Sequence, residues 1–131
     1  MTTRTLLALA AAAAVVLLPF AAAQTRPAAP AGNAARGEML YETRCSACHS
    51  IDNNRVGPAH RGVVGRRSAT APGFTYSAAL RRLNVAWTPA NIDRWLSNPT
   101  AMAPGTAMGI SVPSAQDRAD IIAYLATQRA P

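Results

Sequence analysis

Hydrophobic side chains recur at helical spacing in three segments of the chain, roughly residues 33–45, 88–98 and 114–128. In each segment apolar residues return every three or four positions, as on the buried side of an amphipathic helix. Each segment opens on a residue that favours helix N-caps, namely Asn33, Thr88 and Ser114. No segment keeps the alternation of a strand over a useful length. The pattern therefore predicts an all-α domain of three principal helices.

Local signals define the ends and faces of these helices. Pro89 suits the first helical position, and Asn98-Pro99 ends the second helix. Ser114 and Asp117 resemble a capping box for the third. The apolar side is expected to hold Met39, Leu40 and Tyr41 in the first helix, Ile92, Trp95 and Leu96 in the second, and Ile121, Ile122, Tyr124 and Leu125 in the third.

Between residues 51 and 83 the chain is rich in glycine and proline and shows no sustained period. We expect loops there, with one short helix near Ser77 to Arg82. So long an irregular stretch is unusual in a compact domain unless it wraps around something. A bound macrocycle would supply the missing core, so the segment favours a cofactor.

The N-terminus has the pattern of an export signal. Arg4 precedes an apolar run that ends at Phe20, and three alanines stand before Gln24. We interpret residues 1–23 as a cleaved signal peptide, 24–33 as a flexible leader and 34–131 as the folded domain. The expected location is the periplasm. The alternative is an uncleaved membrane anchor, because residues 6–23 just reach spanning length, although Pro19 weakens it.

The 131 residues carry a net charge of +7. Residues 24–131 keep 12 of the 13 basic side chains and all six acidic ones, which leaves +6, and every basic residue is arginine. The arginines are scattered without stacking aromatics between them, so nucleic acid is not expected as a partner. An acidic docking surface on another protein fits better, met by residues such as Arg44, Arg55 and Arg61.

The most reactive side chains of the sequence stand together in Cys45-Ser46-Ala47-Cys48-His49. Two thiols at this spacing can bond the two vinyl groups of a haem, and the adjacent histidine can bind its iron from the same side. Cys45 and Cys48 are then attachment points for one covalent haem c, and His49 is the proximal ligand. A redox dithiol would expect a βαβ pattern, and zinc would need more ligands in finger spacing.

The sixth iron ligand separates an electron carrier from a haem enzyme. Met39, Met102, Met108 and His60 are the candidates. Met108 has the best context, because the turn Pro104-Gly105-Thr106-Ala107 before it can present a side chain from a loop. Core packing remains the alternative for any single methionine.

These residues together resemble a class I cytochrome c, of the mitochondrial and bacterial cytochrome c2 type. The resemblance covers roughly residues 37–125 and rests on the following motifs: Gly37 with Tyr41, Cys45 to His49, Gly57-Pro58, Gly65-Arg66, Ala71 to Tyr76, Trp87, Asn98-Pro99, Pro104 to Met108, and Ile122 to Leu125. It implies the cytochrome c fold, Met108 as the distal ligand, and outer-sphere electron transfer by a monomer rather than enzymatic catalysis.

The resemblance also implies roles around the haem. The Pro58 carbonyl should accept the Nδ1 hydrogen of His49. Arg66, Tyr76 and Trp87 correspond to residues that hold the haem propionates, with Thr106 a further donor. Gly37 and Tyr41 should pack against Tyr124 where the first and last helices cross.

Three positions depart from the family pattern. His60 does not stand where the family has its loop histidine, so we interpret it as a surface or loop residue rather than an iron ligand. Trp95 replaces a tyrosine near the ligand sulfur, and Met102 stands near the pocket where an aromatic is common. Two other functions stay open: a ligand-binding haem enzyme or sensor, if Met108 leaves the iron free, and a redox subunit of a larger complex.

Overall fold

The computed structural model describes residues 28–131, so the predicted signal peptide lies outside the described residues. The described chain forms five helices in this order: α1 (Ala34–Arg44), α2 (Ala78–Leu83), α3 (Pro89–Ser97), α4 (Pro99–Met102) and α5 (Ala115–Thr127). Within residues 28–131 the only strand-like pairing is an isolated bridge between Arg67 and Ala86. The all-α prediction is confirmed, and α1, α3 and α5 are the three predicted principal helices.

The predicted caps of these helices are present. The side chains of Asn33, Thr88 and Ser114 each accept a hydrogen bond from a backbone N–H in the first turn of α1, α3 and α5. Such bonds satisfy donors that a helix leaves free at its start. Sequence-local chemistry therefore sets where the three long helices begin.

Two expectations about the helices were wrong. The helix α4 was not predicted, because Asn98 was interpreted only as the end of α3. The Asn98 side chain also accepts a hydrogen bond from Ala101 N at 3.0 Å and so starts a new turn. In α1, Met39 is 64% exposed, whereas Tyr41 is buried and Leu40 half-buried. The apolar side of α1 is consequently narrower than expected.

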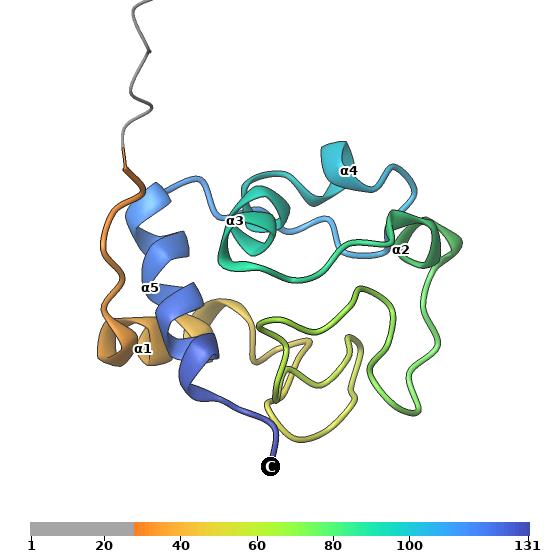
Figure 1. Cartoon of the computed structure of the whole chain (residues 1–131), viewed down its shortest axis with the longest axis horizontal. Helices are drawn as coiled ribbons and strands as arrows, with labels where there is room; N and C mark the ends of the chain where they lie inside the picture. Colours follow the sequence, from red (N-terminus) through yellow and green to blue (C-terminus); the bar gives the residue numbers. More distant parts are fainter. Residues whose placement is uncertain (1–27) are drawn as a thin grey trace, which may run out of the picture.

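Helices α1 and α5 cross at close range (Figure 1). A Cβ added at Gly37 would lie 1.9 Å from the Asp120 carbonyl oxygen and 2.9 Å from the Tyr124 Cβ, so only glycine permits this approach. The rings of Tyr41 and Tyr124 lie 5.4 Å apart. The predicted packing of Gly37 and Tyr41 against Tyr124 is confirmed.

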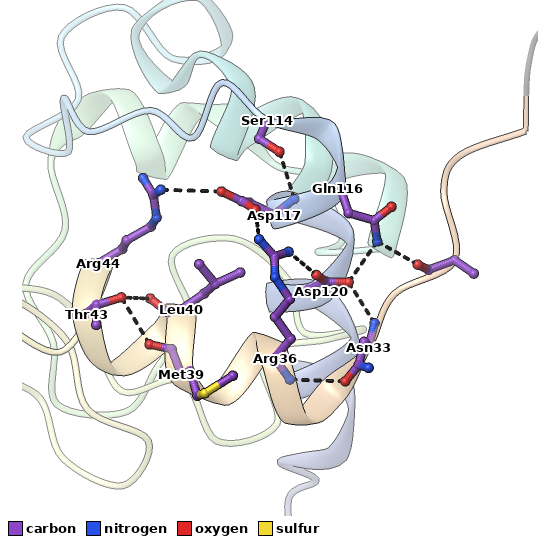
Figure 2. Close-up of polar contacts among 11 residues, drawn as sticks. Asn33, Arg36, Met39, Leu40, Thr43, Arg44, Ser114, Gln116, Asp117 and Asp120 are labelled. Atoms are coloured by element: carbon purple, nitrogen blue, oxygen red, sulfur yellow. Dashed lines mark hydrogen bonds and ion pairs between the residues drawn. The ribbon is translucent and has the colours of Figure 1, made fainter.

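A group of ion pairs closes the same crossing (Figure 2). The Arg36 guanidinium donates to Asp117 at 2.6 Å and also to Asp120. Arg44 pairs with the other oxygen of Asp117 at 3.3 Å. Asp117 therefore fulfils only half of a capping box: its N–H donates to Ser114, but its carboxylate is used between helices.

Asp120 is the most buried carboxylate of the crossing, at 1% exposed. It accepts from Asn33 N at 2.7 Å and from Gln116 Nε2 at 2.9 Å, in addition to its pair with Arg36. These hydrogen bonds, led by that of Asn33, hold the pKa of Asp120 below its usual range. Gln116 also donates to the Ala31 carbonyl, so the chain is fastened to α5 just before α1 begins.

The remaining elements lie beside this crossing (Figure 1). α3 packs against α5, and Arg118 joins them by donating to Asp93 at 2.7 Å. The irregular segment between α1 and α2 fills the half of the molecule opposite α2, α3 and α4. None of the helices between residues 28 and 131 combines the length and the hydropathy needed to cross a membrane.

Candidate haem site

A cavity of about 560 Å³ lies between the irregular segment and the helices α2 and α3. Its volume falls within the range of cofactor pockets, about 300–1,000 Å³. Most of its lining is apolar. The structure brings all nine predicted site residues to this cavity: Cys45, Cys48, His49, Pro58, Arg66, Tyr76, Trp87, Thr106 and Met108.

The two cysteines lie in a single turn at the end of α1. Cys45 is the C-cap, and its carbonyl accepts from the N–H groups of Cys48 at 3.1 Å and His49 at 2.9 Å. Neither thiol forms a disulfide. Cys45 is half-buried, and burial raises the pKa of its thiol to about 11, whereas Cys48 is exposed. This turn places both thiols and the His49 ring along one wall of the cavity.

The His49 ring is held in one orientation. Its Nδ1 lies 2.9 Å from the Pro58 carbonyl oxygen, which can only accept, so Nδ1 carries the hydrogen and Nε2 keeps its lone pair. Burial lowers the pKa of His49, although the bond to Pro58 opposes this shift. A Cβ added at Gly57 would lie 2.2 Å from Cε1 of the ring, so the backbone there packs directly against it. The ring thus offers a neutral nitrogen suited to bind a metal.

His60 is not the surface residue expected from the sequence. It lies in a loop, as predicted, but its ring lines the cavity and stacks on His49 with centroids 4.1 Å apart and planes 20° apart. Burial lowers the pKa of His60 to about 3, and nearby positive charge adds to the shift. Because it lies beside His49, His60 is not placed to ligate from the opposite side of the cavity.

Arg66 brings a cation to the cavity. Its Nη2 donates to the Ala59 carbonyl at 2.9 Å and its Nη1 to the Arg61 carbonyl at 3.1 Å. Its Nε is buried and finds no partner among the residues that the structure describes. Burial lowers the pKa of this guanidinium. An unpaired buried N–H beside the cavity fits a ligand that carries an anionic group, such as a carboxylate.

Tyr76 and Trp87 fill the cavity wall near Arg66. The Tyr76 hydroxyl accepts from Ala71 N at 3.1 Å, which leaves its own hydrogen free for a ligand. Trp87 is buried, and its ring meets that of Trp95 edge to face at 5.4 Å. The Trp87 N–H donates to the Arg66 carbonyl, which ties the two residues together through their backbones.

The opposite wall comes from residues 106–112, between α4 and α5. In Figure 1 this segment runs beside α2 and α3, above residues 45–60. Met108 is half-buried there, and Trp95 donates its Nε1 hydrogen to the Met108 sulfur at 3.2 Å. The Met108 N–H donates to Thr106 Oγ1 at 3.3 Å. Met102 packs against the core and is not among the residues that line the cavity.

The donor set fits a haem. Two unpaired thiols, an imidazole nitrogen and a thioether face one apolar cavity with a buried guanidinium at its edge. Haem iron takes histidine and methionine as axial ligands, and the propionates require cationic or N–H donors. Within residues 28–131 no group of three or more His, Cys, Asp or Glu side chains is placed to hold a metal ion.

Sequence reasoning missed two contacts on the His49 side. Gly57 belongs to the motif Gly57-Pro58, but its packing against the His49 ring was not expected. His60 was interpreted as a surface or loop residue, and its stacking on the His49 ring was not expected. No periodic signal exists in this irregular segment to show which way a side chain faces.

Comparison with known proteins agrees with this geometry. Residues 34–129 match the family model described as Cytochrome c. The chain is 45% identical over 111 residues to "Cytochrome c-type cyt cy" of Rhodobacter capsulatus, which covers 83% of this chain and 56% of that relative's length. It is 43% identical over 102 residues to cytochrome c2 of Rhodopila globiformis, covering 76% of this chain and 96% of the relative.

A solved structure shows the same fold. Cytochrome cH from Methylobacterium extorquens superimposes with a TM-score of 0.70 at 39% identity, and the match covers 73% of this chain and 99% of that one. The expected haem c, attached through Cys45 and Cys48, is the cofactor that this family binds. Proteins of the family carry electrons between redox partners and are not enzymes. The chain therefore belongs to the cytochrome c family and is a haem-based electron carrier.

Proposed function

We propose that this carrier exchanges one electron at a time at an iron held between His49 and Met108. Three observations support His49: the Pro58 carbonyl fixes its tautomer, Gly57 packs on its ring, and the ring lines the cavity with its Nε2 free. Met108 is the methionine that lines the opposite wall of the same cavity. A haem with these two ligands supplies reversible one-electron chemistry at a raised potential.

The other cavity residues would bind the haem propionates and shield the ring from water. Arg66, with its unpaired Nε, and the Tyr76 hydroxyl would hold the haem propionates, with Trp87 and Thr106 as further donors from neighbouring segments. Leu80, Ile92 and similar apolar side chains keep water away from the ring. A dry pocket disfavours the more highly charged ferric state and so contributes to the raised potential.

We also propose that the domain comprises residues 34–131 and works in the periplasm as a monomer after removal of residues 1–23. The export pattern before Gln24 and the naming of bacterial cytochromes c2 and cH among the relatives support this location. Mass spectrometry of the protein purified from its host tests the cleavage. A mature chain that begins near Gln24 is expected, and a retained N-terminus would support the membrane-anchored alternative.

Absorption spectroscopy of the ferric holoprotein tests the ligand pair. Bonding between methionine sulfur and ferric iron gives a weak charge-transfer band in the far red. We expect this band in the wild-type protein and its loss when Met108 is replaced by alanine. A folded wild-type protein without the band, together with rapid binding of carbon monoxide or nitric oxide, would overturn the proposal and favour an enzyme or sensor.

The basic surface points to partners with acidic docking faces. In the structure Arg44 and Arg61 are already paired with Asp117 and Asp52, whereas Arg55 is exposed and donates to the Ser46 carbonyl beside the cysteines. Arg55 is therefore the strongest candidate for docking near the haem edge. Its effect should weaken with salt, because exposed charges are screened over about 10 Å at 0.1 M ionic strength.

Reduction kinetics with native membranes test this docking. The rate for wild type should fall as salt rises, and Arg55→Gln should both slow the reaction at low salt and flatten its salt dependence. Arg129→Gln, at an exposed arginine near the C-terminus, serves as the control. A rate that does not depend on salt would contradict an acidic partner, and isolation only as part of a membrane complex would favour the subunit alternative.

A further inference from the structure

His60 occupies a position that the electron-carrier function does not yet explain. Its ring lies parallel to the His49 ring, with centroids 4.1 Å and planes 20° apart, and both line the cavity. Parallel stacking on one face restricts rotation of the partner ring about its bond to the backbone. A flat side chain in this place can therefore define the plane in which the His49 imidazole lies.

The His60 ring is itself fixed by a second residue. The hydroxyl of Tyr41, whose side chain is 2% exposed, is hydrogen-bonded to His60 Nδ1 at 3.0 Å, and the two rings meet edge to face. The His60 backbone is anchored on both sides: its N–H donates to the Ser50 carbonyl at 3.0 Å, and its carbonyl accepts from Val63 N at 2.9 Å. His60 is thus fixed through both its side chain and its backbone.

The contact connects the site to the helix crossing. Tyr41 lies on α1 and packs against Tyr124 of α5, with ring centroids 5.4 Å apart. A continuous series of rings therefore runs from Tyr124 through Tyr41 and His60 to His49. The segment 57–60 alone supplies three restraints on the His49 ring: Gly57 packs on it, Pro58 bonds its Nδ1 and His60 stacks on it.

We propose that His60 is a positioning residue that, together with Tyr41, sets the plane of the His49 imidazole. The inference rests on the proposed function, in that it assumes His49 to be an iron ligand. The orientation of an axial imidazole decides which iron d orbital holds the unpaired electron of the low-spin ferric state. It therefore controls how spin density is distributed over the haem and reaches the haem edge.

Proton NMR of the ferric holoprotein tests this directly, because the four haem methyl shifts depend on the plane of the axial imidazole. His60→Leu removes the flat ring and the bond to Tyr41, and it should reorder or compress the methyl shifts. Tyr41→Phe keeps every ring and removes only the hydroxyl, so a smaller change in the same direction is expected. Tyr124→Phe is the matched control, because it removes a phenol from the same group of rings without touching His60, and it should reproduce the wild-type pattern.

The outcomes are separable. A wild-type methyl pattern in both His60→Leu and Tyr41→Phe would overturn the inference, whereas a graded change with an unaffected control would support it. If His60→Leu does not fold, Tyr41→Phe against Tyr124→Phe decides alone. The far-red methionine band is recorded for every variant. Its absence from wild type would refute the proposed ligand pair, and its presence with unchanged methyl shifts would refute only the role of His60.

Discussion

The two walls of the haem cavity are built in different ways. The His49 wall comes from residues 45–60, within which the ligand ring is restrained by a carbonyl, a glycine backbone and a second imidazole. The Met108 wall comes from the segment between α4 and α5. Residues 107–111 of that segment make no backbone-to-backbone hydrogen bond within the described chain, and Ile110 is 62% exposed.

This difference matches what each wall has to do. Segments with few buried contacts and few backbone hydrogen bonds open at lower free energy than the packed core. The histidine wall carries the covalent attachment and needs one geometry only. The methionine wall presents the ligand that raises the potential, and its position depends on Trp95 and Thr106.

Met108→Ala should have the largest effect. It removes the sulfur ligand, so the reduction potential should fall by a few tenths of a volt, within the range of roughly 0.8 V that axial ligation spans. The haem should stay attached through Cys45 and Cys48. Potentiometric titration measures the fall, and Met102→Ala is the control because Met102 does not line the cavity. An equal fall in both variants would contradict the assignment of Met108.

A glycine pair compares the tightness of the two walls. A Cβ added at Gly57 would collide with the His49 ring, whereas one added at Gly109 would meet nothing within 4 Å. Gly57→Ala should therefore cost about 1–3 kcal/mol of unfolding free energy, as overpacking usually does. Gly109→Ala should cost far less. Denaturant unfolding of the two holoproteins gives both values, and similar losses would show that the walls do not differ in packing.

Trp95→Phe should change the potential less than loss of the ligand does. The indole N–H withdraws electron density from the Met108 sulfur, which favours ferrous iron, so its removal should lower the potential. The expected shift is on the order of tens of millivolts, because a hydrogen bond contributes about 0.5–1.5 kcal/mol and a tenfold change in a one-electron equilibrium is 59 mV. A rise in potential, measured in the same titration, would contradict this polarity.

Asp120→Asn should leave both walls and the haem spectrum unchanged while it alters acid stability. The pKa of Asp120 is lowered in the folded state, so its stabilisation is complete well above the ordinary value of 3.8 and is lost as the pH falls through the lowered value. The variant should be less stable than wild type at neutral pH, and this difference should shrink in acid. Asp52→Asn is the control: Arg61 lowers the pKa of Asp52 as well, but this pair is exposed and screened by solvent, so the change in stability should be much smaller. If the difference in unfolding free energy between Asp120→Asn and wild type grows as the pH falls, the ionised Asp120 carboxylate does not stabilise the fold.

The sequence predicted the regular elements well because their signals are local. Caps at Asn33, Thr88 and Ser114 and spacings of three and four residues depend only on neighbours along the chain. The turn α4 was missed because Asn98 both ends one helix and starts the next. Met39 was misplaced because only Gly37 and Tyr41 of α1 are buried, and Met39 does not share their face.

The nine site residues reached the cavity as the family resemblance implied, since motif spacing carries that information. The direction of the His60 ring could not be derived in the same way. It depends on backbone bonds to Ser50 and Val63 and on the hydroxyl of Tyr41, three contacts that no periodic pattern encodes. Sequence motifs thus named the groups that meet the haem, whereas the fold was needed to show how one ligand is oriented.

The crossing of α1 and α5 has a consequence for how freely the domain can vary in length. It joins the first and last helices, so roughly 70 residues between them form a closed loop, and lengthening such a loop is inexpensive because each doubling adds only about 0.6 kcal/mol of entropy. Insertions or deletions should therefore be tolerated at exposed positions of the irregular segment that do not line the cavity, such as Pro72 and Gly73, as long as Gly37, Asp117 and Asp120 keep the ends together. The crossing holds the two ends of the loop together. Exposed parts of the irregular segment can therefore change in length while the residues that line the cavity keep their places.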